Sequence, residues 1–351
     1  MSKGYSYTRS KNPTVEVMAA KVAKMEGDGA GAAMFATGMA ATCTIMTAFL
    51  NTGDHAIVTN CSYGGTNRAA RMLFMEKYRV DVTFVDFVDA TAIAAAVQPG
   101  KTKMIFSESP TNPTMMLADV PAISAIAKSC GAVHVVDSTF ATPIIMQPLK
   151  LGADIVITST TKFYCGHNVT VGGAVACKTQ EHIDKILFWQ NVLGNIMSPQ
   201  NAFYQLQTTK TMQVRVQRQS ESATKIATFL EAHPKIDWVR YPGLASYPQK
   251  ELADRQHSNN VHGSMLACEL KGGVEAGRAL MNGVQRPWSL CENLGSVESI
   301  MTCPAVMTHA NMLKADRLKV GITDGFVRIS VGLEESDDLI KALSEALDRC
   351  P

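Results

Sequence analysis

The chain has nine cysteines but no C-x-x-C pair, so neither a zinc site nor a disulfide framework is expected. Charge is also sparse, because only 18% of the 351 residues are charged and the formal net charge is +2. This balance gives no reason to expect nucleic acid or an anionic membrane as a partner. The first ten residues, M-S-K-G-Y-S-Y-T-R-S, contain no apolar signal core. We expect a cytoplasmic globular protein with reduced thiols and no bound metal.

Charged residues are missing altogether from residues 29–53. A membrane-spanning helix is one interpretation of such a run, but threonines and glycines interrupt it. We therefore interpret this run as a buried helix. No internal repeat or low-complexity linker divides the chain, and its length suits one large α/β domain with a smaller one.

The stretch D-I-V-I-T-S-T-T-K-F-Y-C-G-H-N, residues 154–168, carries the strongest chemical signal. Residues 155–158 form a β-branched apolar run of the length expected for a buried strand. Lys162 follows it within a cluster of hydroxyls. Burial disfavours a cationic amine, so we expect the pKa of Lys162 to fall and the amine to become nucleophilic. Such lysines form Schiff bases with carbonyl cofactors, above all pyridoxal 5'-phosphate (PLP).

Two other interpretations compete at this lysine. It could be an ordinary surface lysine that follows a strand. Ser159 and Lys162 also match the S-x-x-K motif of serine β-lactamases and penicillin-binding proteins. That motif requires S-D-N and K-T-G partners, and the chain contains neither.

Polar residues follow one predicted strand after another. The strands predicted at 55–59, 103–106, 133–136 and 155–158 are followed by Tyr63, Asn112, Asp137 and Lys162. In open parallel α/β sheets ligands bind at the carboxyl ends of the strands, so we expect these four side chains to converge. This convergence argues against a surface lysine.

Helices are predicted before and after these strands in the sequence. Residues 14–25 have helical spacing with Thr14 as the expected N-cap. The turn Thr37-Gly38-Met39 opens an apolar helix whose free N–H groups would favour an anion. A helical stretch over 199–233 leads to a region with strands near 264–270 and 326–331 and helices near 274–283 and 335–348. We predict an arm over 1–13, a large domain over 14–215 and a small α+β domain over 216–351.

The chain resembles the PLP-dependent enzymes of cysteine and methionine metabolism, the group of cystathionine γ-lyase, cystathionine γ-synthase, cystathionine β-lyase and methionine γ-lyase. The resemblance runs from Y-S-Y-T-R-S-K-N-P-T to V-R-I-S-V-G-L-E and includes Y-G-G-T, E-S-P-T-N-P, V-D-S-T-F and the lysine block. It implies fold type I, the aspartate aminotransferase-like α/β fold with a mainly parallel sheet, plus the smaller C-terminal domain.

The resemblance also implies roles for the strand-end residues. Lys162 would carry PLP and then move protons, while Asp137 would pair with the pyridinium nitrogen. Tyr63 would stack on the ring and protonate the leaving sulfur. Asn112 would hydrogen-bond the ring hydroxyl. The phosphate would be held by two backbone N–H groups and two hydroxyls, those of Gly38, Met39, Ser159 and Thr161.

Further expected contacts lie near the two ends of the chain. Tyr7 and Arg9 would reach the phosphate site of a neighbouring subunit, so self-association as a dimer or a dimer of dimers is expected. Arg328 would bind the substrate carboxylate in a bidentate manner. Glu292 and Asn293 would contact the substrate, and Asn293 stands where the family has serine. Relatives usually have further residues before Y-S-Y-T-R.

The reaction within the family is predicted from weaker signals. Y-G-G-T and Glu292 resemble cystathionine γ-lyases, and Gly65 stands where methionine γ-lyases typically have cysteine. The segment N-I-M-S-P-Q-N-A-F is more similar to homoserine-ester sulfhydrylases and synthases. We favour α,γ-elimination of cystathionine, with γ-replacement on an O-acylhomoserine or methionine γ-lyase activity as alternatives. An inactive paralogue acting as a binding subunit is a further hypothesis.

Overall fold

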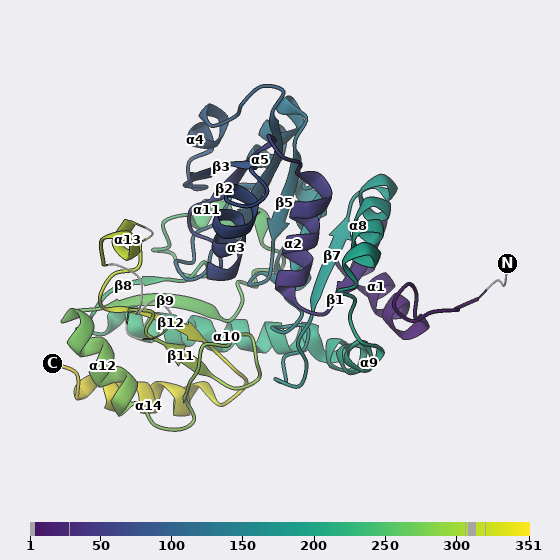
Figure 1. Ribbon diagram of the computed structural model, residues 1–351. Helices are drawn as coiled ribbons and strands as arrows, with labels where there is room; N and C mark the ends of the chain where they lie inside the picture. The colour runs from purple at the N-terminus through teal and green to yellow at the C-terminus, as the bar shows by residue number, and fades with distance from the viewer. Residues whose placement is uncertain (1–3, 28, 306, 308–313, 320) are drawn as a thin grey trace. The chain divides into compact units, whose positions relative to one another are not determined.

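The computed structural model describes residues 4–27, 29–305, 307, 314–319 and 321–351 (Figure 1). The chain divides into two compact units. The first comprises Met1–Ser109 and Leu117–Lys210, and the second comprises Pro110–Met116 and Thr211–Pro351. Among the described residues no helix is long and apolar enough to cross a bilayer.

The first unit is built on a seven-stranded sheet in the order β1-β7-β6-β5-β4-β2-β3. All neighbouring pairs are parallel except those of β7, which runs against both β1 and β6. The prediction of a mainly parallel α/β sheet is therefore confirmed. The strands are β1 Gly31–Phe35, β2 His55–Thr59, β3 Asp81–Val85, β4 Thr102–Glu108, β5 Val133–Asp137, β6 Ile155–Thr158 and β7 Gly173–Cys177.

Helices cover both faces of this sheet, because its central strands are apolar on both sides. On one face Phe106, Val135 and Ile157 pack against α2 and α8. On the other face Ile57 and Ile105 pack against α4 and α5. The helical segments of the unit are α1 Pro13–Met25, α2 Gly38–Phe49, α3 Gly64–Arg68, a π-helix Ala69–Met75, α4 Ala90–Ala95, α5 Val120–Cys130, α6 Thr142–Ile145, α7 Pro148–Leu151, α8 Gln180–Leu193, α9 Pro199–Thr208 and a 3₁₀ turn Thr209–Thr211.

The uncharged run 29–53 is a strand and a helix, so its interpretation as one buried helix is wrong. Thr37 separates the two elements, because its hydroxyl accepts the Ala40 N–H at 2.9 Å as an N-cap. The run lacks charge because both elements are largely buried.

Two other helix boundaries differ from prediction. Asn12, not Thr14, is the N-cap of α1, because Pro13 occupies the first turn and the Asn12 side chain accepts the Thr14 N–H at 3.0 Å. The single helical stretch predicted over 199–233 is α9 and α10 (Met212–Ala232) separated by the 3₁₀ turn.

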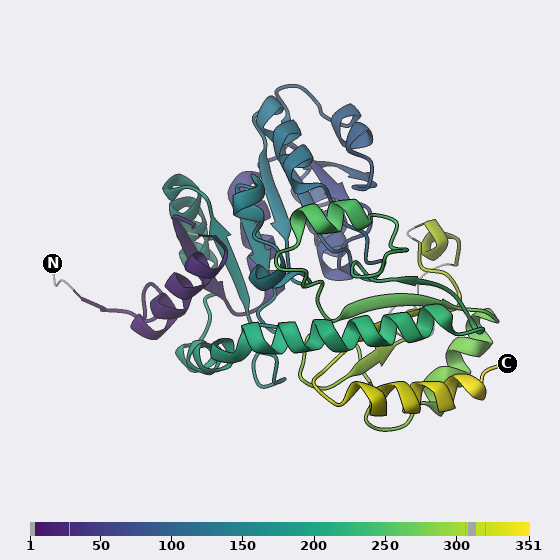
Figure 2. The same ribbon diagram turned by 180° about the vertical axis from the view of Figure 1, so that it is seen from behind.

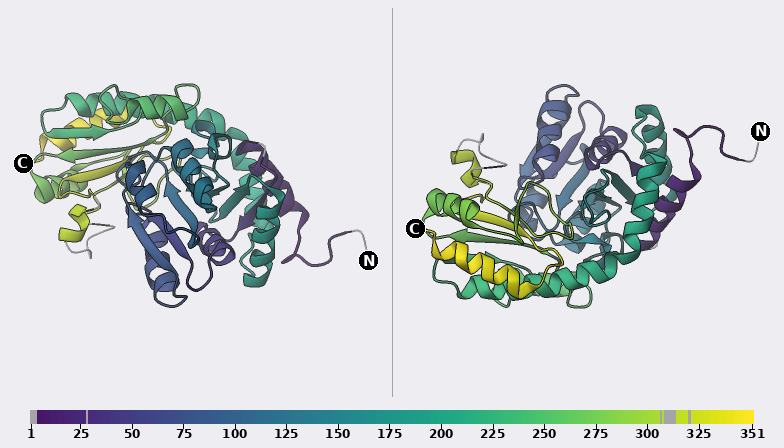
Figure 3. Two further views of the ribbon diagram at one scale, coloured as in Figure 1. Left: turned by 90° about the horizontal axis from the view of Figure 1, so that it is seen from above. Right: turned by 90° about the horizontal axis from the view of Figure 1, so that it is seen from below.

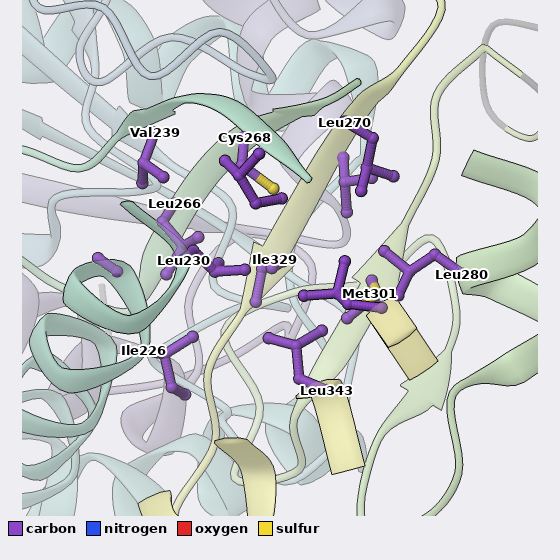
Figure 4. Packing of buried hydrophobic residues seen from close by; sticks show 14 of the residues in the cluster. Ile226, Leu230, Val239, Leu266, Cys268, Leu270, Leu280, Met301, Ile329 and Leu343 are labelled. Atoms are coloured by element: carbon purple, nitrogen blue, oxygen red, sulfur yellow. The ribbon is translucent and has the colours of Figure 1, made fainter. Parts of the chain in front are cut away.

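The second unit contains a five-stranded sheet in the order β10-β11-β12-β9-β8. Alternate residues of β9 and β12, such as Leu266, Cys268 and Ile329, pack with the helices α10, α12 and α14 in one apolar cluster (Figure 4). Figure 2 shows α10 running along the sheet, and Figure 3 shows it with α14 from above and below. The elements are α10 Met212–Ala232, β8 Ile236–Arg240, α11 Lys250–Gln256, β9 Met265–Leu270, α12 Gly273–Gly283, β10 Ser289–Leu290, β11 Ile300–Thr302, α13 Lys314–Lys319, β12 Phe326–Ser330 and α14 Ser336–Asp348.

Candidate active site

Three of the predicted residues stand at one edge of the first sheet. The strands β6, β5, β4 and β2 are neighbours in that order, and each pair is parallel. Asp137 is the last residue of β5, while Lys162 and Tyr63 each come four residues after the end of their strands. The structure therefore places Lys162, Asp137 and Tyr63 in segments that leave the carboxyl edge, where open α/β sheets bind ligands.

Lys162 lies in a compact turn after β6 and is half-buried. Its N–H donates to the Ser159 carbonyl at 3.2 Å, and its own carbonyl accepts the Gly166 N–H at 2.7 Å. The Thr161 hydroxyl binds the Gly172 backbone, accepting its N–H at 3.0 Å. The turn is thus held at both ends, and the lysine backbone is fixed before any ligand binds.

Thr139 joins Asp137 to this turn. The Thr139 hydroxyl donates to Asp137 Oδ1 at 2.6 Å and accepts the Ser159 N–H at 2.9 Å. The Thr139 backbone N–H also donates to Oδ1 at 3.0 Å. Burial raises the pKa of Asp137 to about 6, although both Thr139 bonds favour the carboxylate. A cation at this carboxylate would offset the cost of burying its charge.

The start of α2 lies directly against Ser159. A Cβ added to Gly38 would be 3.0 Å from Ser159 Cβ and 3.2 Å from its hydroxyl oxygen. A Cβ on Gly173 would be 2.4 Å from the Thr37 carbonyl oxygen. Two glycines therefore let the N-terminus of α2, with its unpaired N–H groups, approach the lysine turn. Backbone N–H groups, a helix dipole and a serine hydroxyl together suit a phosphate.

Tyr63 is positioned by a residue that the sequence analysis did not single out. The Glu108 carboxylate accepts the Tyr63 backbone N–H at 2.8 Å, and Glu108 is buried at the end of β4. A Cβ on Gly65 would be 2.6 Å from the Tyr63 ring and 2.7 Å from Met39 Sδ. The Tyr63 ring therefore lies beside the start of α2, and with 51% of the residue exposed it can stack on a ligand.

Arg328 and Asn112 form a separate cluster within the second unit. Arg328 points away from the apolar cluster, because its neighbours Val327 and Ile329 pack into it. Its Nη1 donates to Asn112 Oδ1 at 3.0 Å. Its Nη2 donates to the carbonyl oxygens of Glu292 at 2.9 Å and Asn293 at 3.2 Å. Burial lowers the pKa of Arg328 to about 10, so it stays cationic at neutral pH.

Asn112 was predicted as a partner of a cofactor hydroxyl, and its side-chain oxygen binds Arg328 instead. The two assignments are compatible, since the amide of Asn112 has a separate NH₂ donor group. Glu292 and Asn293 approach Arg328 through their main-chain oxygens, so their expected side-chain contacts with substrate stay predictions.

Tyr7 and Arg9 lie in the exposed arm. Arg9 donates to Asn191 Oδ1 of its own chain at 2.7 Å and lies 5.2 Å from the Tyr7 ring centroid. Both residues line a groove of about 890 Å³ between the arm, α1, β1 and α8. Lys162 and Asp137 do not line this groove, so it is distinct from the strand-end site.

Comparison with known proteins gives these features a context. The family described as Cys/Met metabolism PLP-dependent enzyme matches residues 1–348. The chain belongs to this family. It is 42% identical to a cystathionine β-lyase of Coxiella burnetii over 346 residues, 98% of this chain and 88% of the relative. It is 39% identical to a cystathionine γ-lyase of Bacillus subtilis over 345 residues, 98% of this chain and 89% of the relative.

A solved structure gives the same result. The cystathionine γ-synthase of Xanthomonas oryzae pv. oryzae, in complex with aminoacrylate and cysteine, is similar with a TM-score of 0.94 and 38% identity. The match covers 99% of this chain and 88% of that chain. The predicted family, the fold-type I architecture and the dependence on PLP are thereby confirmed.

The residues present fit PLP. The cradle of Gly38, Met39 and Ser159 suits its phosphate, and buried Asp137 suits its protonated ring nitrogen. Two further hydroxyl oxygens, Ser138 Oγ and Thr160 Oγ1, are buried without a hydrogen-bond partner among the described residues.

Thr139 and Glu108 are the positioning residues that sequence reasoning missed. Both stand in motifs that carried the resemblance, V-D-S-T-F and E-S-P-T-N-P. Thr139 stands two residues after Asp137, the spacing of an Asx turn, whereas Glu108 binds Tyr63 across 45 positions, which no spacing rule identifies.

Proposed function

We propose that the protein is a PLP-dependent carbon–sulfur lyase that cleaves cystathionine by α,γ-elimination, giving cysteine, 2-oxobutanoate and ammonia with the uptake of one water. The observation that carries this proposal is the linkage of the Lys162 turn, Asp137 and the start of α2 through Thr139, Ser159 and Gly38. Relatives that share nearly the whole chain include a cystathionine γ-lyase. This reaction also agrees with the Y-G-G-T motif and Glu292.

When bound, PLP supplies an electron sink for the carbanion that forms at the substrate Cα. The cofactor phosphate would lie on the N–H groups of Gly38 and Met39 and the hydroxyls of Ser159 and Thr161. The Asp137 carboxylate would hold the ring nitrogen in its protonated form. Such a charge-assisted hydrogen bond contributes roughly 1.5–3 kcal/mol.

The remaining residues would bind substrate and move protons. Arg328 would bind the α-carboxylate through donors that Asn112 and the 292–293 carbonyls do not use. The Lys162 amine, once released, would take the proton from Cα and move protons at Cβ. The Tyr63 hydroxyl would donate a proton to the leaving sulfur. In this proposal Asn112 both contacts the cofactor hydroxyl and orients Arg328.

We also propose that the protein acts in the cytoplasm as a dimer or a dimer of dimers. Tyr7 and Arg9 would then reach the phosphate site of a neighbouring subunit. The exposure of both side chains supports this role. Light scattering on the purified protein tests the assembly, and Arg9→Ala should weaken PLP binding only if the arm crosses between subunits.

Two specific observations favour other reactions. The relative at 42% identity is a cystathionine β-lyase, which suggests β-elimination to homocysteine, pyruvate and ammonia. The segment N-I-M-S-P-Q-N-A-F and the similarity to a γ-synthase favour γ-replacement on an O-acylhomoserine.

Product analysis decides between these reactions. The purified protein is scanned for the yellow colour of bound PLP, then given cystathionine while oxo acids are identified by chromatography. Release of 2-oxobutanoate supports the proposal. Pyruvate instead would move the assignment to β-elimination, and no oxo acid together with condensation of O-acylhomoserine and a thiol would move it to γ-replacement.

A further inference from the structure

The turn that carries Lys162 is tied to the distant helix α1 by a buried acid. The Tyr164 hydroxyl donates to Glu26 Oε1 at 2.9 Å, and the two residues are 138 positions apart. Glu26 is the C-cap of α1, and Tyr164 lies two residues after Lys162. Both side chains are fully buried, at 1% and 0% exposure. This contact plays no part in the proposed chemistry.

The Glu26 carboxyl is kept in its neutral, protonated form. Burial raises the pKa of Glu26 to about 8, and the bond from Tyr164 only partly opposes this. Glu26 Oε2 has no hydrogen-bond partner among the described residues. The methylenes of Lys150 lie over the neighbouring Gly27, where an added Cβ would be 3.0 Å from Lys150 Cγ. A protonated carboxyl that still accepts the Tyr164 hydroxyl is the form that this site stabilises.

The bond is one of several that attach the lysine turn to the rest of the first unit. Within the turn the backbone bonds are local, from Lys162 to Ser159 and from Cys165 to Thr160. Beyond the turn, the Ser159 N–H donates to the Thr139 hydroxyl, Thr161 binds the Gly172 backbone, and the Tyr164 carbonyl accepts the Thr208 hydroxyl at 2.9 Å. The Tyr164–Glu26 bond attaches the turn to α1, so we expect its loss to loosen the turn on that side while the sheet remains intact.

We infer that Glu26 and Tyr164 are a positioning pair that fixes the turn of Lys162 against α1 and so sets the geometry in which the lysine meets its cofactor. This inference rests on the proposed role of Lys162. Neither residue touches the reacting atoms. The expected signature is therefore a change in cofactor affinity and in the reactivity of the Lys162 amine, and kcat should fall more than KM rises.

Two matched pairs of variants test the inference in the full-length protein. Tyr164→Phe removes one buried hydroxyl, and Tyr241→Phe is its control. Tyr241 is equally buried in the second unit and donates to the Ser220 and Gly263 carbonyls at 3.1 and 3.0 Å. Glu26→Leu removes the acceptor, whereas Glu26→Gln keeps a neutral one.

Two readouts are measured for each variant. The first is the dissociation constant of PLP. The second is the pH midpoint at which acetic anhydride labels the Lys162 amine, followed by peptide mass spectrometry with and without PLP. We expect Tyr164→Phe and Glu26→Leu to raise the dissociation constant about tenfold, the effect of one buried hydrogen bond. Both should also shift the labelling midpoint by about half a pH unit.

A purely structural role would give a different pattern. Tyr164→Phe would then lower the melting temperature as Tyr241→Phe does and leave both readouts unchanged, which overturns the inference. If Tyr164→Phe does not fold, equal behaviour of Glu26→Leu and Glu26→Gln overturns it. A wild-type protein that binds no PLP contradicts the proposed function, and the labelling of Lys162 without PLP still tests the positioning pair.

Discussion

Asp137 and Arg328 are buried charged side chains on strands of the two units, and their charges have opposite sign. Asp137 ends β5 of the first unit, and Arg328 lies within β12 of the second. Burial raises the pKa of Asp137 to about 6 and lowers that of Arg328 to about 10. In both cases burial disfavours the charged form. Of these two pKa values, only that of Asp137 is brought near physiological pH.

The hydrogen-bond partners of both groups are neutral. Thr139 donates twice to Asp137, whereas Arg328 donates to an amide oxygen and two main-chain carbonyls. Neutral partners satisfy hydrogen bonds but add no opposite charge, although the Glu292 carboxylate also favours the charged form of Arg328. The first unit is therefore suited to a cationic ring and the second to a carboxylate. These are the charges of the PLP pyridinium and of an amino-acid substrate.

The largest expected effect comes from removing Lys162, because neither Asp137 nor Arg328 can support catalysis without it. Lys162→Ala should abolish both turnover and the yellow colour that borohydride bleaches, because no other amine holds the position after β6. Absorption spectra and an oxo-acid assay check this. The control is Lys178→Ala, an exposed lysine directly after β7. Retained colour and turnover in Lys162→Ala would refute the assignment of the lysine.

The next largest effect is expected from removing the negative charge of Asp137. Asp137→Asn should lower kcat about 100-fold, since a neutral amide cannot hold the ring nitrogen protonated and a charge-assisted bond of roughly 1.5–3 kcal/mol is lost. Asp154→Asn is the control, because that carboxylate binds the His134 N–H at the opposite end of the strands. Equal losses in the two variants would mean that Asp137 only supports the fold.

The raised pKa of Asp137 should also make the free energy of unfolding depend on pH. The folded-state pKa of Asp137, about 6, lies above its ordinary value of 3.8. Its stabilising contribution is therefore complete below pH 3.8 and is lost as the pH rises through 6. Relative to Asp137→Asn, the protein without cofactor should lose roughly 2 kcal/mol between pH 4 and 7. Urea unfolding at several pH values measures this, and a difference that does not vary with pH would contradict it.

The smallest effect is expected from replacing the guanidinium of Arg328. Arg328→Lys keeps the charge but loses the planar pair of donors, so KM for the amino acid should rise about tenfold with little change in kcat. Steady-state kinetics checks this. Arg240→Lys is the control, since Arg240 binds the Thr114 carbonyl of the same short segment at 3.4 Å. An unchanged KM would place carboxylate binding elsewhere.

Local signals in the sequence were sufficient for the parallel sheet and its carboxyl edge. Strand β6 was predicted to the residue, because four β-branched apolar residues stand between polar ones. Strand β1 was missed, since Gly31–Phe35 lies in the same uncharged run as α2 and has no alternation of its own.

Long-range partners carried no comparable signal. Nothing in the sequence indicates that Pro110–Met116 packs with the second unit, although it directly follows β4. The bond between Glu26 and Tyr164 is equally unpredictable, because a glutamate at a helix end usually reaches solvent. Packing decides such contacts, and a single sequence records them only as isolated residues.

The contacts of Arg328 have a consequence for how specificity can diversify. The guanidinium donates its hydrogen bonds at residues 292 and 293 to main-chain oxygens, while the Glu292 carboxylate favours its charge. Every amino acid supplies the same carbonyl, so mutations at these two positions can explore new substrates while the arginine keeps its orientation. The second unit thus orients its arginine through backbone atoms that a change of side chain at either position does not remove.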